Sequence, residues 1–183
     1  MSPRLAISLN ILALYAIAGV LGAAFYFQFA DGELPCPLCM LQRVAFVALA
    51  IGPMLTIVSG PQARNYGLII LAGLIGMLTS GRQVLLHIMP GDPGFGSPVM
   101  DLHYYTWAFI CFTVGILASG IMLCFERQFE PQISEPEVGF FGKSAIAIVL
   151  ALTLLNSAGA LVQCGFDECP STPVEYKLLP SLR

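Results

Sequence analysis

The sequence predicts an all-α membrane protein built as a bundle of five transmembrane helices. Two observations carry this prediction. Of the 183 residues, 57% are apolar and only 10% are charged, whereas soluble domains carry about 25% charged residues. The apolar residues also gather into five runs of roughly membrane-spanning length, about 20 residues each. Because Lys and Arg are so scarce, there is no basic surface for phosphates, and the sequence excludes a nucleic-acid partner.

The predicted helices cover residues 5–30, 41–60, 66–89, 104–125 and 144–163 of a single integral membrane domain, 1–183. Turn-forming residues separate them at 31–35, 59–62, 90–94 and 130–136. The first run could be mistaken for a cleaved signal peptide, since it follows Arg4. It is about 25 residues long, however, which exceeds the apolar core of a signal peptide, and it ends in the interfacial aromatic cluster at 25–27. We therefore expect it to remain as a membrane anchor.

The positions of Lys and Arg predict the orientation of the bundle. With the N-terminus in the cytoplasm, the inner side carries Arg4, Arg64, Arg127 and Lys143, and the outer side carries Lys177 and Arg183, with Arg43 at an outer helix start. This excess on the inner side follows the positive-inside rule. With five spans, the loops at 31–40 and 90–103 and the tail 164–183 all lie outside. Four of the six cysteines are thus predicted on one face.

The first candidate site is the C-x-x-C motif of Cys36 and Cys39, just before a predicted helix start. The second sulfur then lies near unpaired N–H groups and the positive end of the helix dipole, which favour a thiolate. Arg43 follows Cys39 by four residues and falls on the same helix face, where its permanent charge stabilises that anion. Arg43 could instead extend to the lipid headgroups, but the preceding motif favours the thiolate role.

The second candidate site is the pair Cys164 and Cys169 at the start of the tail. These thiols are able to close a small disulfide loop, with Gly165 favouring the turn. Two interpretations stay open: a structural staple, or a pair that exchanges with the C-x-x-C. Binding of a metal ion by the four outer thiolates is a further alternative. Cys111 and Cys124 fall within the fourth span, where we expect small buried hydrophobic residues.

The third predicted span is interrupted near its outer end by Arg82, Gln83 and His87. An Arg at a helix centre costs about 2.5 to 3.5 kcal/mol on insertion scales, so a partner for Arg82 is expected. Gln83 and His87 share one face and are suited to hydrogen bonding between helices. Alternatively, Arg82 and His87 line an outer-leaflet pocket for a lipid-soluble molecule with carbonyl oxygens, such as a membrane quinone. The loop at 90–98 is expected to be a compact turn that covers this pocket.

The segment Cys36-Pro37-Leu38-Cys39-Met40-Leu41-Gln42-Arg43 resembles the first outer loop of the DsbB family of disulfide bond formation proteins. The likeness extends over the first four spans, and residues 81–87 resemble the family's third-span quinone region. The resemblance implies a four-helix DsbB-like core in the bacterial inner membrane. It also implies an enzyme that reoxidises a periplasmic DsbA-like thiol oxidoreductase and passes two electrons to ubiquinone or menaquinone.

The same resemblance implies roles for individual residues. Cys39 is expected to be the thiolate that faces the quinone, with Arg43 stabilising its charge, and Cys36 is expected to exchange with the second cysteine pair. By a looser alignment, Arg82 and His87 are quinone-site residues. All of these residues are expected on the periplasmic side of the membrane.

The chain departs from the family in the place of its second cysteine pair. Family members generally have four spans and carry that pair between the third and fourth, whereas here residues 88–103 contain no cysteine. Cys164 and Cys169 can replace it only if the tail folds back over the first loop. Electrons would then pass from the tail pair to Cys36 and Cys39 and on to the quinone. A quinone reductase of the vitamin-K-epoxide-reductase type, which normally carries its C-x-x-C after a later span, and a membrane metal-binding or assembly factor are the alternatives.

Overall fold

The computed structural model describes residues 1–130, 138–169, 173 and 175–178, and within them it contains five long helices and no strand. The helices are α1 (Pro3–Ala30), α2 (Pro37–Ser59), α3 (Ala63–Leu86), α4 (Tyr104–Leu123) and α5 (Phe140–Cys164), with a short 3-10 helix, η1 (Glu126–Phe129), after α4. Each long helix is long and apolar enough to cross a bilayer. The predicted all-α membrane fold is therefore confirmed. The predicted break at 131–136 and Arg183 lie outside the described residues.

Helix α4 begins at Tyr104, as predicted, and the other four long helices begin earlier than the predicted spans. The first residue of α2 is Pro37 rather than residue 41, and α5 begins at Phe140 rather than 144. An apolar run marks the lipid-embedded part of a helix, whereas its backbone hydrogen bonds continue outward to the capping residue. In α2 the cap is Cys36, and Pro37 occupies the first helical position. The C-x-x-C motif is consequently the cap and first turn of α2, not a segment preceding it.

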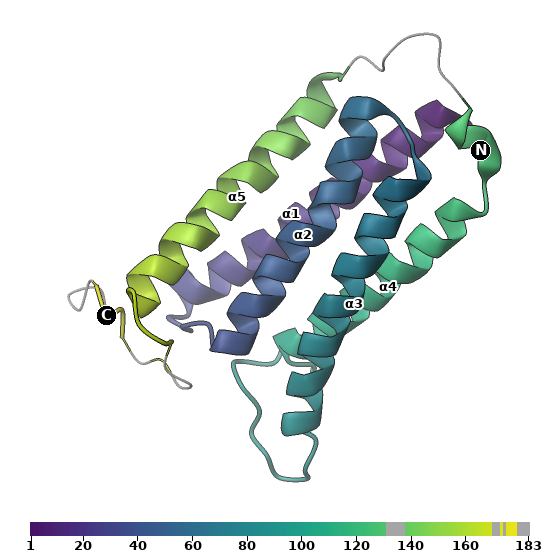
Figure 1. Cartoon of the computed structure of the whole chain (residues 1–183). Coiled ribbons are helices and arrows are strands. Elements are labelled where there is room, and N and C mark those ends of the chain that lie inside the picture. The colour runs from purple at the N-terminus through teal and green to yellow at the C-terminus, as the bar shows by residue number, and fades with distance from the viewer. Residues whose placement is uncertain (131–137, 170–172, 174, 179–183) are drawn as a thin grey trace.

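Successive helices run antiparallel (Figure 1), so the connections alternate between the two ends of the bundle. The α1–α2 loop, the α3–α4 loop and the segment after α5 lie at one end, as the odd number of spans predicts. We call this the thiol end. Helix α2 packs against α1 and α3, α3 packs against α4, and α5 packs against α1 and α2. Both cysteine pairs therefore meet at the same end.

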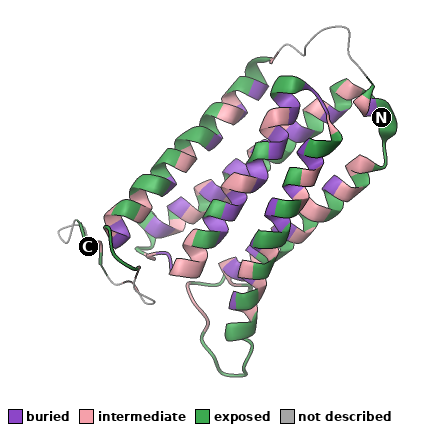
Figure 2. Cartoon of the chain, in the orientation of Figure 1, coloured by how far each residue is buried: buried purple, intermediate pink, exposed green. Residues whose placement is uncertain are grey.

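The core lies on the inward faces of the helices, while the outward faces are apolar and exposed, as a lipid-facing surface should be (Figure 2). Phe46 of α2 stacks on Phe112 of α4 with 4.1 Å between ring centroids. Gly76 of α3 packs against the Phe112 ring, where a side chain would overlap it. Small residues at such positions let helix backbones approach closely in lipid.

Buried polar side chains near the end opposite the thiol end are paired with one another. Asn10 of α1 donates to the Tyr66 hydroxyl of α3 at 3.2 Å, and that hydroxyl donates to Gln128 of η1 at 2.9 Å. With no water in the hydrocarbon core, such groups must find partners within the protein. This chain of bonds fastens η1 and the two helices together.

Replacing Gly52 with alanine is expected to destabilise the contact between α2 and α3. The new Cβ would lie 2.5 Å from the backbone oxygen of Asn65 and against the Ile69 side chain. Forcing the helices apart costs about 1–3 kcal/mol, which thermal unfolding in detergent will register as a lower Tm. Gly67→Ala is the matched control, because nothing lies within 4 Å of its added Cβ. Equal melting temperatures for the two variants would contradict this packing.

Candidate active site

The C-x-x-C sulfurs are held at the N-terminus of α2. Cys36 caps the helix, and its Sγ accepts the backbone N–H of Cys39 at 3.1 Å. The two cysteines form a disulfide. Cys36 is buried, and Cys39 lines a cavity. On reduction, the unpaired N–H groups and the helix dipole favour an anionic sulfur at this position.

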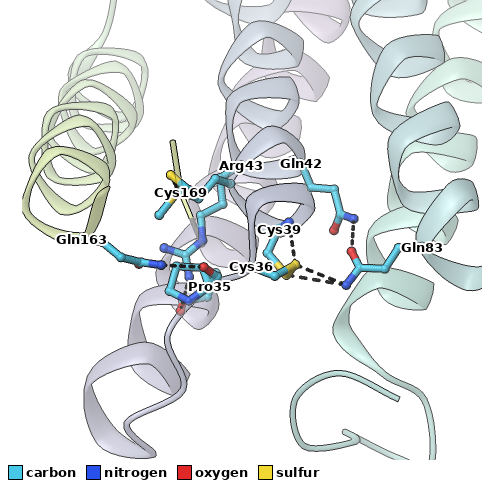
Figure 3. Close-up of a disulfide and its surroundings, with 10 residues drawn as sticks. Pro35, Cys36, Cys39, Gln42, Arg43, Gln83, Gln163 and Cys169 are labelled. Carbon is cyan, nitrogen blue, oxygen red and sulfur yellow. Dashed lines mark hydrogen bonds between the residues drawn. A yellow bond between two sulfur atoms is a disulfide. The ribbon is translucent and has the colours of Figure 1, made fainter. Parts of the chain in front are cut away.

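Gln83 of α3 is a side chain that donates to both sulfurs (Figure 3). Its Nε2 donates to Cys36 Sγ at 3.4 Å and to Cys39 Sγ at 3.7 Å, while its Oε1 accepts from Gln42 Nε2 at 2.8 Å. Both amides are buried. The Gln83 oxygen faces Gln42, and the N–H end of the amide is directed at the sulfurs. The sequence predicted only hydrogen bonding between helices for Gln83. The one sequence signal for a role at the sulfurs was the presence of an amide inside an apolar span.

Arg43 does not extend to the headgroups. Its guanidinium donates to Gln28 Oε1 at 2.6 Å and to the Ala24 backbone oxygen at 2.9 Å, and its Cζ lies 5.1 Å from the centroid of the Phe25 ring. All three partners belong to α1, so Arg43 joins α2 to α1 while lining the same cavity as Cys39. The guanidinium is thus held in place beside the site rather than being free to follow the lipid surface.

The cavity has a volume of about 310 Å³ and lies between α1, α2 and α4. Its wall is mainly apolar and aromatic, with Phe46, Tyr105 and Trp107 among the lining residues. Its polar lining residues include Gln28, Glu33, Cys39, Gln42 and Arg43. This combination of an apolar wall with a few polar groups is typical of small-molecule sites.

The loop between α3 and α4 covers the cavity, as the sequence predicts. Phe95, Gly96 and Val99 of this loop line it. Glu33 of the α1–α2 loop accepts the backbone N–H of Ser97 at 2.8 Å and also bonds the Ser97 hydroxyl. The two loops are thereby tied together over the outer side of the cavity.

A second anchor of the covering loop is Asp92. Its Oδ1 accepts the Gly94 N–H at 2.8 Å and lies 3.0 Å from His87 Nδ1. The Gly94 N–H, and after it His87, hold the pKa of Asp92 below its ordinary value. Because that pKa is depressed on folding, the turn keeps its carboxylate at neutral pH and loses it only as the pH falls through the lowered value.

Of the two residues predicted for a quinone pocket on α3, the structure brings one near the cavity. His87 caps the C-terminus of α3, and its ring stacks on Tyr105, a lining residue, with 5.5 Å between centroids. His87 therefore stands behind the cavity wall. Arg82 is exposed on α3 and is not among the lining residues. The structure does not place Arg82 at this site.

The second cysteine pair lies directly against the first turn of α2. Cys164 and Cys169 form a disulfide, and each Sγ is 3.9 Å from Sδ of Met40, the residue after Cys39. Gln163, the last residue of α5 before this pair, donates to the Pro35 backbone oxygen at 2.7 Å (Figure 3). The tail thus folds back over the first loop, which is the condition for electron exchange between the pairs.

The expectation that the other two cysteines are buried is wrong for Cys124 and holds only in part for Cys111, which packs against the core. Cys111 is half-buried and lines the cavity, and Cys124 is exposed at the C-cap of α4. An apolar run does not distinguish a face that packs inward from one that meets lipid, since both are apolar.

Metal binding by the four outer thiols is not favoured, because both pairs are disulfides. Among the residues that the structure describes, no group of three or more His, Cys, Asp or Glu side chains is arranged to hold a metal ion.

Comparison with known proteins places these features in a family. The family model for disulfide bond formation protein DsbB matches residues 6–97, half of the chain. Curated proteins named disulfide bond formation protein B are similar: 43% identity over 84 residues in Nitrosomonas eutropha (44% of this chain, 52% of the relative), and 40% over 79 residues in Marinobacter nauticus (41% and 47%). In Aromatoleum aromaticum the identity is 36% over 103 residues (54% and 61%).

The chain spans about half the length of these relatives. No solved structure matches it significantly. The matched region contains the C-x-x-C, Arg43 and Gln83, whereas α4, α5 and the tail cysteines lie beyond it. On the strength of that match, this chain belongs to the DsbB family of disulfide bond formation proteins.

Proposed function

We propose that this protein is a quinone-dependent thiol oxidoreductase of the bacterial inner membrane, with ubiquinone or menaquinone as acceptor, that reoxidises a periplasmic DsbA-like protein. One observation carries the proposal. Two disulfides meet at the thiol end of the bundle. The disulfide between Cys36 and Cys39, which we call the inner pair, opens onto an apolar cavity. Membership of the DsbB family supports an activity that generates disulfides. The positive-inside bias supports a periplasmic location for the thiol end.

The residues around the cavity fit a quinone. Its apolar wall suits a ring and the start of an isoprenoid tail, and Arg43 and the Gln42 amide are donors suited to carbonyl oxygens. A bound quinone supplies an acceptor for two electrons and two protons. Cys39 is the cysteine of the inner pair that lines the cavity, so the chain itself presents this sulfur to the acceptor.

The outer exchange begins at the tail pair. Cys169 is less buried than Cys164, so we assign the partner-facing sulfur to Cys169. The partner's thiolate attacks Cys169 Sγ and releases Cys164 as a thiolate. The partner's second thiol then attacks the partner sulfur of this mixed disulfide and releases Cys169. The partner leaves oxidised, and two electrons and two protons remain with the tail pair.

The inner exchange passes these electrons to the C-x-x-C. One tail thiolate attacks Cys36 Sγ and releases Cys39 as a thiolate, and the other tail thiol resolves the mixed disulfide and releases Cys36. The tail disulfide is re-formed, and Cys36 and Cys39 hold the electron pair. The helix N-terminus and the Gln83 amide stabilise the Cys39 thiolate.

The direct test is reduction of a short-chain, water-soluble quinone by the purified protein in detergent, with a reduced thioredoxin-fold protein as dithiol donor. We expect one donor disulfide for each quinone reduced. Bound metal in stoichiometric amount without quinone turnover would support the metal-binding alternative instead. Cysteine labelling that placed the tail in the cytosol while Cys36 and Cys39 remained exported would overturn the electron path, since a bilayer would then separate the pairs.

Gln83→Leu is expected to slow electron transfer from the reduced C-x-x-C to quinone by about 10- to 100-fold. The change removes the N–H donor to both sulfurs and keeps a similar volume. A hydrogen bond to a charged group contributes about 1.5–3 kcal/mol, and each 1.4 kcal/mol is a factor of ten in rate. Single-turnover kinetics of the pre-reduced protein measure this effect. Gln62→Leu, at the opposite end of α3, is the control, and a wild-type rate for Gln83→Leu would show that the amide has no role at the sulfurs.

A further inference from the structure

The C-terminal tail continues past its disulfide, and its residue Tyr176 contacts Gln28, which lines the cavity where we propose that the quinone binds. Gln28 Nε2 donates to the Tyr176 hydroxyl at 3.2 Å, and Gln28 Oε1 accepts from Arg43 at 2.6 Å. We propose that Tyr176 is a positioning residue for the acceptor site, holding the Arg43 guanidinium at the cavity through the Gln28 amide. This inference rests on the proposed function. It gives the C-terminal tail a role in quinone binding as well as in thiol exchange.

The chemistry of the three groups explains why Tyr176 is needed. A guanidinium only donates hydrogen bonds, so the Gln28 oxygen must face Arg43. The Gln28 amide nitrogen then becomes a buried donor that requires an acceptor, because Gln28 is only 3% exposed. The Tyr176 hydroxyl is that acceptor. Without it, the buried amide nitrogen has no acceptor, and any shift of the Gln28 side chain toward another acceptor breaks the shortest hydrogen bond of Arg43.

Hydrogen bonds that do not involve Gln28 hold the tail in place. The backbone N–H groups of Lys177 and Leu178 donate to the carbonyl oxygens of Gln163 and Val162 at 3.3 and 3.1 Å. Lys177 Nζ also donates to the Glu168 backbone oxygen at 3.1 Å, within the loop closed by the tail disulfide. Tyr176 is therefore placed by the same segment that carries the tail cysteines, and this segment lies outside the region matched by the family model.

The test uses the one tryptophan of the chain, Trp107, which lines the cavity. Quenching of its fluorescence by a short-chain ubiquinone reports quinone binding without turnover. We expect Tyr176→Phe to weaken the quinone affinity about tenfold and to raise KM for quinone while leaving KM for the dithiol donor unchanged. Tyr26→Phe, at an exposed position of α1, is the matched control and should bind as wild type does. Wild-type affinity in Tyr176→Phe would overturn the inference.

A second variant separates positioning of Arg43 from a general loosening of the tail. In Gln28→Glu a carboxylate accepts from Arg43 and leaves no amide nitrogen in need of an acceptor. Tyr176→Phe should then cost less than twofold in quinone affinity when added to Gln28→Glu. A tenfold loss that persists in this background would overturn the route through Gln28. Absence of quenching in the wild-type protein would instead refute quinone binding itself, and with it both proposals.

Discussion

Replacing Cys39 with alanine should reduce thiol-driven quinone reduction by about a thousandfold or more, as loss of a reacting nucleophile commonly does. Cys39 is the sulfur of the inner pair that lines the cavity. Without it, Cys36 has no partner with which to re-form a disulfide, and the site has no electron pair to give. The measurement is steady-state reduction of a soluble quinone, with a reduced thioredoxin-fold protein as donor.

Cys124→Ala is the matched control for this variant. Cys124 is a free, exposed cysteine at the far end of α4, and its loss should leave the rate unchanged. Thermal unfolding checks that the Cys39 variant keeps its fold. If a folded Cys39→Ala protein turned over at even a tenth of the wild-type rate, the inner pair would not be the route to quinone.

Cys164→Ala is expected to abolish oxidation of a protein dithiol, with a loss of about a hundredfold or more. Cys36 is buried and Cys39 lines the cavity, whereas Cys169 of the tail disulfide is half-buried and is not among the lining residues. In the proposed path a protein partner therefore reacts with the tail pair. Electron transfer from Cys36 and Cys39, once they are reduced chemically, should still reach quinone in a single turnover.

This pattern distinguishes a relay from a structural staple. Loss of a staple lowers the melting temperature and leaves the rate of partner oxidation close to wild type at temperatures where the protein is folded. Loss of a relay residue instead lowers the rate of partner oxidation even at temperatures where the protein is folded. Unchanged partner oxidation in Cys164→Ala would therefore assign the tail disulfide to stability alone and remove the outer step from the proposed path.

The five helices, and the location of both cysteine pairs at the same end of the bundle, could be predicted from the sequence because lipid imposes a simple rule. A spanning helix needs about 20 apolar residues, and the number of spans then decides which connections share a side. That argument predicts Cys36, Cys39, Cys164 and Cys169 on one side of the membrane, whereas the contact of the tail pair with the first turn of α2 is a finding of the structure. The N-terminal capping of α2 by Cys36 follows from backbone hydrogen bonding, on which hydropathy carries no information.

The contacts that complete the site could not be predicted in the same way. Gln28 and Gln163 are single amides in apolar helices, and which neighbour each one meets depends on how the helices rotate against one another. Inward and lipid-facing sides are both apolar, so the sequence does not specify that rotation. For the same reason Arg82 was expected near the cavity, whereas the structure exposes it on α3.

The covering loop after α3 carries no cysteine, and the second cysteine pair instead follows α5. The cover of the hydrophobic chamber and the second dithiol are thus assigned to different stretches of polypeptide. Under the proposed function, substitutions in the first stretch would tune selectivity for the lipid-borne oxidant, and substitutions beside the tail cysteines would alter which partner protein is oxidised. Apart from the contact between Tyr176 and Gln28, which joins the tail to the cavity, the two stretches can consequently vary independently of one another.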